Sequence, residues 1–165
     1  MNYCAIRKFD VANGEGVRAS LFVSGCRHHC KGCFSKQTWD FCSGSKFTDK
    51  VEDELLSYCD NPHVAGLSIL GGDPFEPENQ PRILQLLKRF RAKYPGKTVW
   101  MYTGCTYDEL RGNTGCSHYR TDITDEILSL ADVLVDGPFV EELKDISLNF
   151  RGSSNQRIVN LHDAQ

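Results

Sequence analysis

Three cysteines fall within one short segment, and their spacing points more directly to chemistry than any other feature of this sequence. Cys26, Cys30 and Cys33 form a C-x3-C-x2-C pattern directly after the apolar run 19–23. Thiolates bind iron and zinc well, so three of them this close together indicate a metal centre. A [4Fe-4S] cluster normally takes four cysteine ligands. A loop that supplies three leaves one iron free for a small molecule, and we expect the chemistry of this chain at that iron.

A closed zinc site is the main alternative use of the same cysteines. His28, His29 or Cys42 could complete a Cys3His or Cys4 site. Zinc sites usually combine two ligand pairs across a longer stretch, and the sequence has no second C-x2-C and no H-x3-H. Eight cysteines in 165 residues are also fewer than a disulfide-stapled domain carries. The spacing favours an iron–sulfur cluster, and a non-catalytic zinc-binding module stays open as an alternative.

Composition describes an ordinary globular chain. For 165 residues one core is expected, so we predict a single domain over 1–165. A net charge of -3 and a pI near 5.9 give no general attraction to nucleic acid. The N-terminus lacks an apolar signal region, and no stretch approaches the roughly 18 apolar residues that span a membrane. We therefore expect no nucleic-acid or membrane partner and a reducing, cytoplasmic location.

Strand and helix patterns alternate along the chain, which predicts a parallel α/β sheet with helical crossovers. Predicted strands cover 18–24, 65–70, 98–102, 133–135 and 157–159. One predicted helix follows Thr48 as its N-cap, and two more cover 79–94 and 124–131. A closed eight-fold barrel needs about 200 residues or more. The expected fold class is therefore α/β, an open partial (β/α) barrel with a mostly parallel sheet of five or six strands.

Chemically distinctive residues fall at the carboxyl ends of these predicted strands, where the site of such a sheet lies. They are the cysteine loop, Gly71-Gly72-Asp73, Thr103-Gly104 and Asp136-Gly137. Glycines at a strand end allow a backbone to approach a ligand closely, so carbonyls there could accept hydrogen bonds from an ammonium group. A tight turn before a helix would use the same residues. Both interpretations stay open for the glycine pair taken alone.

Taken together and in order, these segments resemble the radical S-adenosylmethionine superfamily, of which C-x3-C-x2-C is the hallmark. The chain is similar to the branch that activates anaerobic ribonucleotide reductases, because Gly32 and Phe34 flank the third cysteine and Asp73 follows the glycine pair. The matching segments span nearly the whole chain: 14–18, 21–34, 37–39, 70–74, 102–104, 132–139 and 150–157. Residues 105–121, with Cys105 and Cys116, look longer than in that family, and we expect a surface loop there.

The resemblance implies two cofactors in one site, a [4Fe-4S] cluster and S-adenosyl-L-methionine. It implies that the catalytic and metal-binding residues are Cys26, Cys30 and Cys33. It places Gly32, Cys33 and Phe34 beside the adenine, and it assigns Gly71, Gly72 and Asp73 to the methionyl ammonium. The implied reaction is reductive cleavage of the cofactor to a 5′-deoxyadenosyl radical, which takes a hydrogen atom from a glycine of a large partner.

The resemblance also implies the partners. The protein that receives the glycyl radical is the large subunit of an anaerobic ribonucleoside-triphosphate reductase, and a flavodoxin-like protein supplies the electron. A homodimer within a heterotetramer is an assembly that it allows. A radical enzyme that uses the same cofactor on another protein or a small molecule is the remaining alternative.

Several residues near the motifs receive narrower expectations. Tyr102, Thr103 and Asp136 could contact ribose or substrate, or could merely cap helices. His28 and His29 are expected to be ordinary polar loop residues. Residues 151–157 are expected to form a docking or lid loop over the site.

Overall fold

All strands of the described residues, 1–114 and 117–163, lie in one sheet of seven strands in this computed structural model. They are β1 (Asn2–Asp10), β2 (Val17–Val23), β3 (Ser45–Lys46), β4 (Val64–Gly71), β5 (Thr98–Tyr102), β6 (Val133–Asp136) and β7 (Arg157–Asn160). Their order is β3-β1-β2-β4-β5-β6-β7, so β3 and β7 form the two edges. The central strands β2, β4, β5 and β6 run parallel, whereas β1, β3 and β7 pair antiparallel. The predicted α/β class is confirmed.

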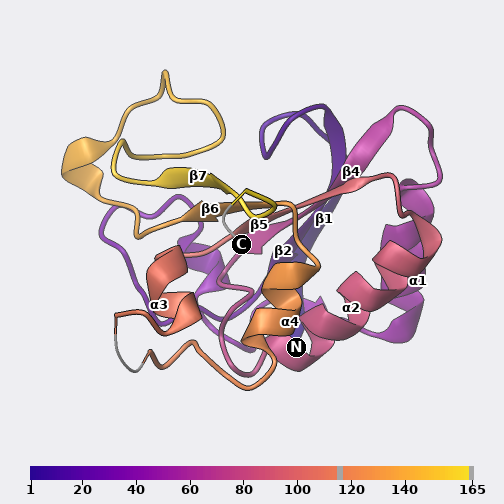
Figure 1. The fold of residues 1–165 in the computed structure, drawn as a ribbon, viewed down its shortest axis with the longest axis horizontal. Coiled ribbons are helices and arrows are strands. Elements are labelled where there is room, and N and C mark those ends of the chain that lie inside the picture. Colours follow the sequence, from indigo (N-terminus) through magenta and orange to yellow (C-terminus); the bar gives the residue numbers. More distant parts are fainter. Residues whose placement is uncertain (115–116, 164–165) are drawn as a thin grey trace.

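Helices connect the parallel strands, and Figure 1 shows them gathered on one side of the sheet, away from the orange and yellow segment that follows β6. They are α1 (Asp49–Tyr58), α2 (Gln80–Lys93), α3 (Tyr107–Arg111) and α4 (Thr124–Ser129), with short 3-10 turns η1 (Lys36–Thr38) and η2 (Glu141–Leu143). The Thr48 side chain accepts a hydrogen bond from the Val51 N–H, so the predicted N-cap is confirmed.

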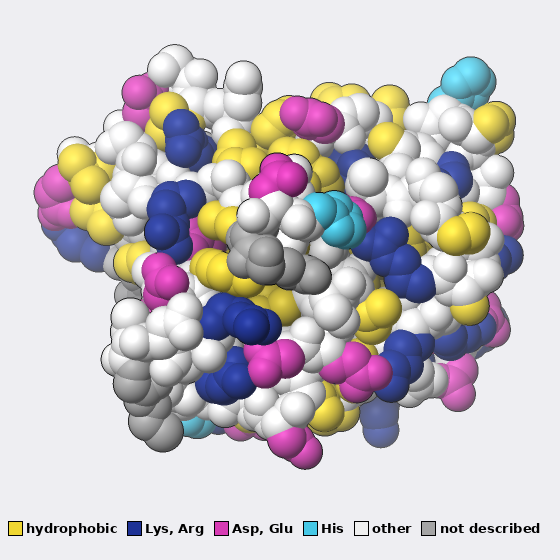
Figure 2. Space-filling model, in the orientation of Figure 1, with side chains coloured by type: hydrophobic (Ala, Val, Ile, Leu, Met, Phe, Trp, Pro, Cys, Tyr) yellow, Lys and Arg dark blue, Asp and Glu magenta, His cyan; other side chains and the backbone are white. Residues whose placement is uncertain are grey.

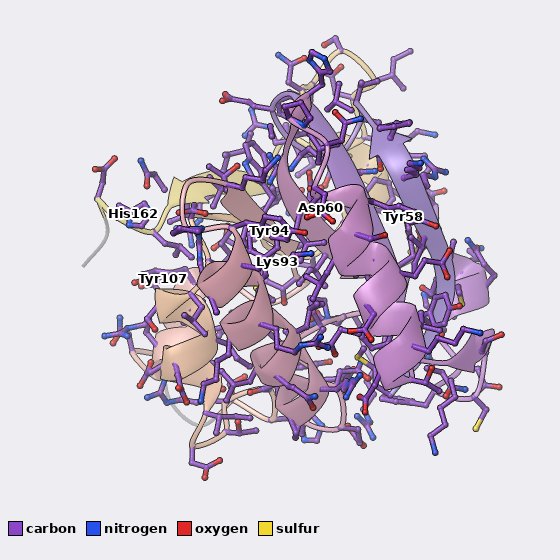
Figure 3. All side chains as sticks on the ribbon, turned by 90° about the vertical axis from the view of Figure 1, so that its right-hand side faces the viewer. Tyr58, Asp60, Lys93, Tyr94, Tyr107 and His162 are labelled. Atoms are coloured by element: carbon purple, nitrogen blue, oxygen red, sulfur yellow. The ribbon has the colours of Figure 1, made fainter. Side chains whose placement is uncertain are left out.

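The core lies between the helices and the sheet, because successive side chains of a strand point to opposite faces. Tyr94 joins two of the covering helices. Its hydroxyl donates hydrogen bonds to the Leu56 carbonyl at 2.6 Å and to Asp60 at 2.7 Å, and Lys93 pairs with the same carboxylate (Figure 3). The apolar core is formed by fully buried residues of the central strands and of α2, among them Leu21, Leu67, Ile69, Met101, Leu134, Ile83, Leu87 and Phe90.

A buried arginine ties the amino-terminal ends of the central strands together. Arg18 is 1% exposed and forms no ion pair within the described residues. Its guanidinium donates instead to the Ser68 hydroxyl, to the Leu67 and Thr98 carbonyls and to the Glu15 carbonyl. Burial lowers the pKa of Arg18 to about 10. Arg18 thus lies at the end of the sheet opposite to the carboxyl strand ends, where the candidate site lies.

Four elements differ from the sequence prediction, and the sheet has seven strands rather than the expected five or six. Strand β3 was not predicted, because it has only two residues. Strand β1 was not predicted, because as an outer strand it is largely half-buried or exposed and lacks a continuous apolar run. Strand β7 lies where a strand was expected but runs antiparallel. Helix α3 occupies part of 105–121, where a loop was expected; it is defined by a Thr106–Glu109 capping box rather than by an apolar stripe. Cys116 lies outside the described residues.

Charges on the surface are interspersed rather than gathered by sign. Figure 2 shows basic and acidic side chains alternating over one face of the molecule. Ion pairs such as Lys88–Glu126 and Arg120–Asp125 account for part of this pattern. Among the described helices, none is both long enough and apolar enough to cross a membrane.

Candidate functional site

The three loop thiols line one cavity at the carboxyl edge of the sheet. The cavity measures about 760 Å³, and Cys26, Cys30 and Cys33 all contribute to its wall. Residues from the ends of β4 and β5 complete the same wall, namely Gly71, Gly72, Asp73, Tyr102, Thr103 and Gly104. Segments that the sequence placed at separate strand ends therefore meet around a single space of the size that small ligands occupy.

Backbone hydrogen bonds fix the cysteine loop from two sides. The N–H of Cys26 donates to the Trp39 carbonyl at 3.0 Å, and the N–H of Asp73 donates to the Gly25 carbonyl at 2.8 Å. A Cβ atom at Gly72 would lie 2.4 Å from that Gly25 oxygen. The glycine at position 72 is thus required for the approach of the β4 turn to the cysteine loop.

Asp73 is the centre of a buried hydrogen-bond network. Its carboxylate is 1% exposed, and one oxygen accepts the Phe75 N–H at 2.8 Å. The other oxygen contacts His28 Nε2 at 2.9 Å, the Thr103 hydroxyl at 2.9 Å and the Gly104 N–H at 3.0 Å. One carboxylate therefore fastens the cysteine loop, the β4 turn and the end of β5 to one another.

His28 is more than an ordinary polar loop residue, which corrects the expectation from the sequence. Besides its contact with Asp73, its ring stacks on Tyr119 with centroids 4.5 Å apart, and Cys105 Sγ lies 3.7 Å from its Nε2. The sequence feature that could have indicated the His28–Asp73 pair is a histidine within the cysteine loop together with a carboxylate at the end of the next parallel strand. His29 instead stacks on Trp39.

The spacing of the thiols distinguishes between a single ion and a cluster. Among the described residues, one group of three potential ligand atoms lies within 4.8 Å of one another. It belongs to His28, Asp73 and Cys105, and not to the loop cysteines. A tetrahedral zinc with Zn–S bonds of about 2.3 Å would hold its sulfurs roughly 3.8 Å apart. The three loop sulfurs do not form such a group, so at least one pair of them lies more than 4.8 Å apart, wider than the spacing around a single zinc. The His28–Asp73–Cys105 group is a hydrogen-bond network, because one Asp73 oxygen already has three partners.

Burial shapes the electrostatics of the thiols. It raises the pKa of Cys26 to about 12, with the charge of Asp73 adding to the effect, and it also raises the pKa of Cys30. Reactive cysteine nucleophiles need a lowered pKa. Cys26 and Cys30 are therefore unsuited to act as free nucleophiles, whereas coordination to iron would hold them as thiolates.

A fourth cysteine, Cys4, also lines the cavity. Its Sγ lies 3.2 Å from the Ser24 hydroxyl and donates to the Gln37 carbonyl at 3.7 Å. All seven cysteines of the described residues are free, so none is held in a disulfide. Cys4 is thus a thiol beside the site that already has polar partners in the protein.

Three polar atoms in residues of the cavity wall are buried and have no hydrogen-bond partner among the described residues. They are the Tyr102 hydroxyl, the Arg151 Nε and the Trp39 Nε1. Buried donors are normally paired. Burial raises the pKa of Tyr102, so its hydroxyl stays protonated and can donate. Unpaired donors around three thiols fit a site that holds a sulfur-rich cluster and a polar cofactor.

Of the remaining predicted residues, some line the cavity and others lie outside its wall. Phe34 lines the cavity, is 63% exposed and meets the Phe139 ring with centroids 5.2 Å apart. Gly32 has a left-handed backbone (φ 72), and the Glu141 side chain packs against it. Asp136 is fully buried outside the cavity wall, where it accepts hydrogen bonds from Arg157 and from the Tyr107 N–H. Its role is structural.

The segment 151–157 is fastened to the end of β6. The Gln156 side chain accepts the N–H groups of Gly152 and Ser153 and donates to the Gly137 carbonyl. Asn155 donates to the Pro138 carbonyl at 2.7 Å. These contacts make the segment a fixed part of the cavity wall.

Fold and site together define an iron–sulfur domain. Residues 12–159 match the family described as "4Fe-4S single cluster domain". The chain is 44% identical over 163 residues to the anaerobic ribonucleoside-triphosphate reductase-activating protein of Escherichia coli (strain K12), covering 98% of this chain and 99% of that protein. It is 41% identical to the protein of that name from Vibrio cholerae, covering 96% and 97%, and 35% identical to that of Enterobacteria phage T4, covering 96% and 93%. The chain belongs to this family of reductase-activating proteins.

Proposed function

We propose that this chain activates an anaerobic ribonucleoside-triphosphate reductase by generating a glycyl radical on its large subunit. The observation that carries the proposal is the cavity itself, whose wall combines the three loop cysteines with the ends of β4 and β5. Family membership supports the same function, since the relatives are named as activators of that reductase. The whole of 1–165 would act as one unit, its sheet curving around the cavity as an open part-barrel.

Cys26, Cys30 and Cys33 would hold a [4Fe-4S] cluster and leave one iron without a protein thiolate. When bound, the cluster and S-adenosyl-L-methionine would supply the radical chemistry, a one-electron cleavage to methionine and a 5′-deoxyadenosyl radical. That radical would take a hydrogen atom from the partner's glycine. This makes the chain a radical S-adenosylmethionine oxidoreductase in which the three cysteines are the catalytic residues.

The protein's own contribution is to position the cofactor and exclude water. Carbonyls of the Gly71–Gly72 turn would accept hydrogen bonds from the methionyl ammonium. Asp73 would place a buried negative charge beside that ammonium while its oxygens keep the turn fixed. Gly32, Cys33 and the exposed ring of Phe34 would face the adenine.

The proposal includes a one-electron donor of the flavodoxin type and the reducing interior of a cell, where seven free cysteines are compatible with their surroundings. A homodimer bound within a heterotetramer is the assembly we propose. The large partner would reach the cavity beside Phe34 and Ile146, which line it and are 63% and 93% exposed.

Anaerobic purification followed by metal analysis is the first test. About four irons per chain and a brown absorbance would support the cluster; a single zinc and no colour would support the structural module instead. Reduced protein, S-adenosylmethionine and the purified reductase should then give a glycyl radical signal in electron paramagnetic resonance. Methionine release without that signal would show that the chain uses the same cofactor on a different substrate.

A further inference from the structure

Trp39 occupies a distinctive place beside the cysteine loop. Its carbonyl accepts the Cys26 N–H at 3.0 Å, and its ring stacks on His29 with centroids 4.4 Å apart and planes inclined by 22°. His29 has a left-handed backbone (φ 46), which is uncommon for a residue with a side chain. Two independent contacts with the loop therefore set the position of the indole.

Trp39 and Cys26 line two cavities. Both residues line the cavity of about 760 Å³ that holds the loop cysteines, and both also line a second cavity of about 410 Å³ together with Arg27, His29, Asp40 and Phe41. Trp39 is thus bonded through its carbonyl to the first cysteine of the loop and contributes to both cavities.

The indole N–H has no acceptor among the described residues, although it is buried. An indole nitrogen can only donate. A buried donor without a protein acceptor is uncommon and calls for an explanation. Tyr102 and Arg151 carry similar atoms, but Trp39 differs from them because its backbone is bonded directly to the first cysteine of the loop.

We propose that the indole N–H of Trp39 donates a hydrogen bond to a bridging sulfide of the cluster and thereby raises the reduction potential of that cluster. The inference rests on the proposed ligation by Cys26, Cys30 and Cys33. Hydrogen bonds to cluster sulfurs are one of the means by which proteins set iron–sulfur potentials. Reduction adds negative charge to the sulfurs, so a donor stabilises the reduced state more than the oxidised one.

Substitution of the two tryptophans of the chain provides a matched pair of variants. Trp39→Phe keeps an aromatic ring against His29 and removes the N–H. Trp100→Phe makes the same chemical change at a residue that packs on Arg18 and Phe150, outside the cavity wall. Both variants and the unaltered full chain are loaded with iron and sulfide anaerobically, and the cluster potential is measured by redox titration followed by electron paramagnetic resonance.

We expect Trp39→Phe to retain its iron and to lower the equilibrium constant for one-electron reduction about tenfold, which corresponds to a potential about 59 mV more negative. Trp100→Phe should keep the potential of the unaltered chain. An unchanged potential in iron-loaded Trp39→Phe would overturn the inference and leave the proposed function intact. A full chain that binds no four-iron cluster would overturn both.

A second measurement does not depend on the folding of Trp39→Phe. The full chain is labelled with 15N in the indole, and nitrogen hyperfine coupling to the reduced cluster is sought by pulsed electron paramagnetic resonance. A coupling that persists in Trp100→Phe supports the proposal. Its absence from the unaltered, cluster-loaded chain refutes the proposal.

Discussion

Individual cysteines of the cavity are expected to differ in what they contribute. Cys30→Ala should lose the cluster, and with it cleavage of S-adenosylmethionine, because two thiols and a methyl group cannot hold four irons. Cys4→Ser is the matched control: it also removes a thiol from the cavity wall, but one whose contacts are with Ser24 and Gln37. Iron and sulfide content of anaerobically loaded protein checks both variants. Loss of the cluster in Cys4→Ser would show that no iron is left open.

Asp73→Asn should weaken both the fold and cofactor binding. An amide places an N–H₂ group where a carboxylate oxygen accepts hydrogen bonds, so at least one buried donor loses its acceptor. We expect the free energy of unfolding of the metal-free chain to fall by about 2 kcal/mol. Urea denaturation measures this, and equilibrium binding of S-adenosylmethionine to loaded protein measures the second effect.

Asp145→Asn serves as the control for that change. Asp145 also lines the cavity, but it is exposed and its side chain bonds to neighbouring Ser147. Its replacement should change stability by no more than about 0.5 kcal/mol. Equal effects of the two substitutions would contradict the central role given to Asp73.

At the level of single residues, the sequence indicated the cysteine motif but not the side chains that hold the cysteine loop in place. The spacing of Cys26, Cys30 and Cys33, the proposed ligands, is local, so it can be read from eight consecutive residues. The His28–Asp73 contact joins residues 45 positions apart and depends on the alignment of β2 with β4. Asp136 was a candidate for ligand contact, yet its carboxylate accepts hydrogen bonds from Arg157 and from the Tyr107 N–H. No local sequence pattern predicts these contacts.

The turn after β4 is expected to tolerate no side chain at its second glycine. Gly72→Ala would bring a methyl group against the Gly25 carbonyl, so the cysteine loop must shift. We expect the free energy of unfolding to fall by about 1–3 kcal/mol, and both iron retention and affinity for S-adenosylmethionine to fall. Gly96→Ala is the control, since nothing lies within 4 Å of the added atom. Normal iron loading in Gly72→Ala would show that the loop adjusts freely.

Asp132 links α2, β5 and the residues after β7. Its carboxylate accepts hydrogen bonds from Arg91 and the Val99 N–H and contacts His162, each at 2.6 Å. Burial alone would raise the pKa of Asp132, but these partners outweigh it and hold the pKa below the ordinary 3.8. A carboxyl group with a lowered pKa in the folded state stabilises the protein above the unfolded value and loses that contribution as the pH falls.

Asp132→Asn should therefore cost stability in a pH-dependent way. The difference in free energy of unfolding between the unaltered chain and the variant is expected to be largest near pH 5 and to shrink as the pH falls below 3.8. Urea denaturation at several pH values between 5 and 3 measures it. The exposed Asp122, changed to Asn, should give no such trend. A constant difference for Asp132→Asn would contradict the assignment.

Central elements of the fold were predictable, and peripheral ones were not. Buried parallel strands such as β4 and β5 carry apolar runs because both of their faces are covered. The outer strand β1 has no such run, and the antiparallel pairing of β7 depends on which edge the chain returns to. Helix α3 has five residues, too few for an apolar period to show.

The whole molecule separates its core from its site. None of Cys26, Cys30 and Cys33 belongs to the apolar core, which is built from the central strands and their helices. Removal of the cluster by a chelator should leave the sheet folded and loosen the cysteine loop, unlike small metal domains that unfold without their ion. Hydrogen exchange should show lost protection within 26–42 and kept protection in β4 and β5. Loss of protection throughout would show that the cluster holds the fold together.

Cys26 borders two cavities, so a molecule that fills the larger one leaves a second approach to the same residue. An electron carrier arriving beside Arg27 and Phe41 would not compete for space with a large protein seated over the larger cavity. Reloading with electrons could then proceed while that protein stays in place, and successive turnovers would not require the complex to come apart.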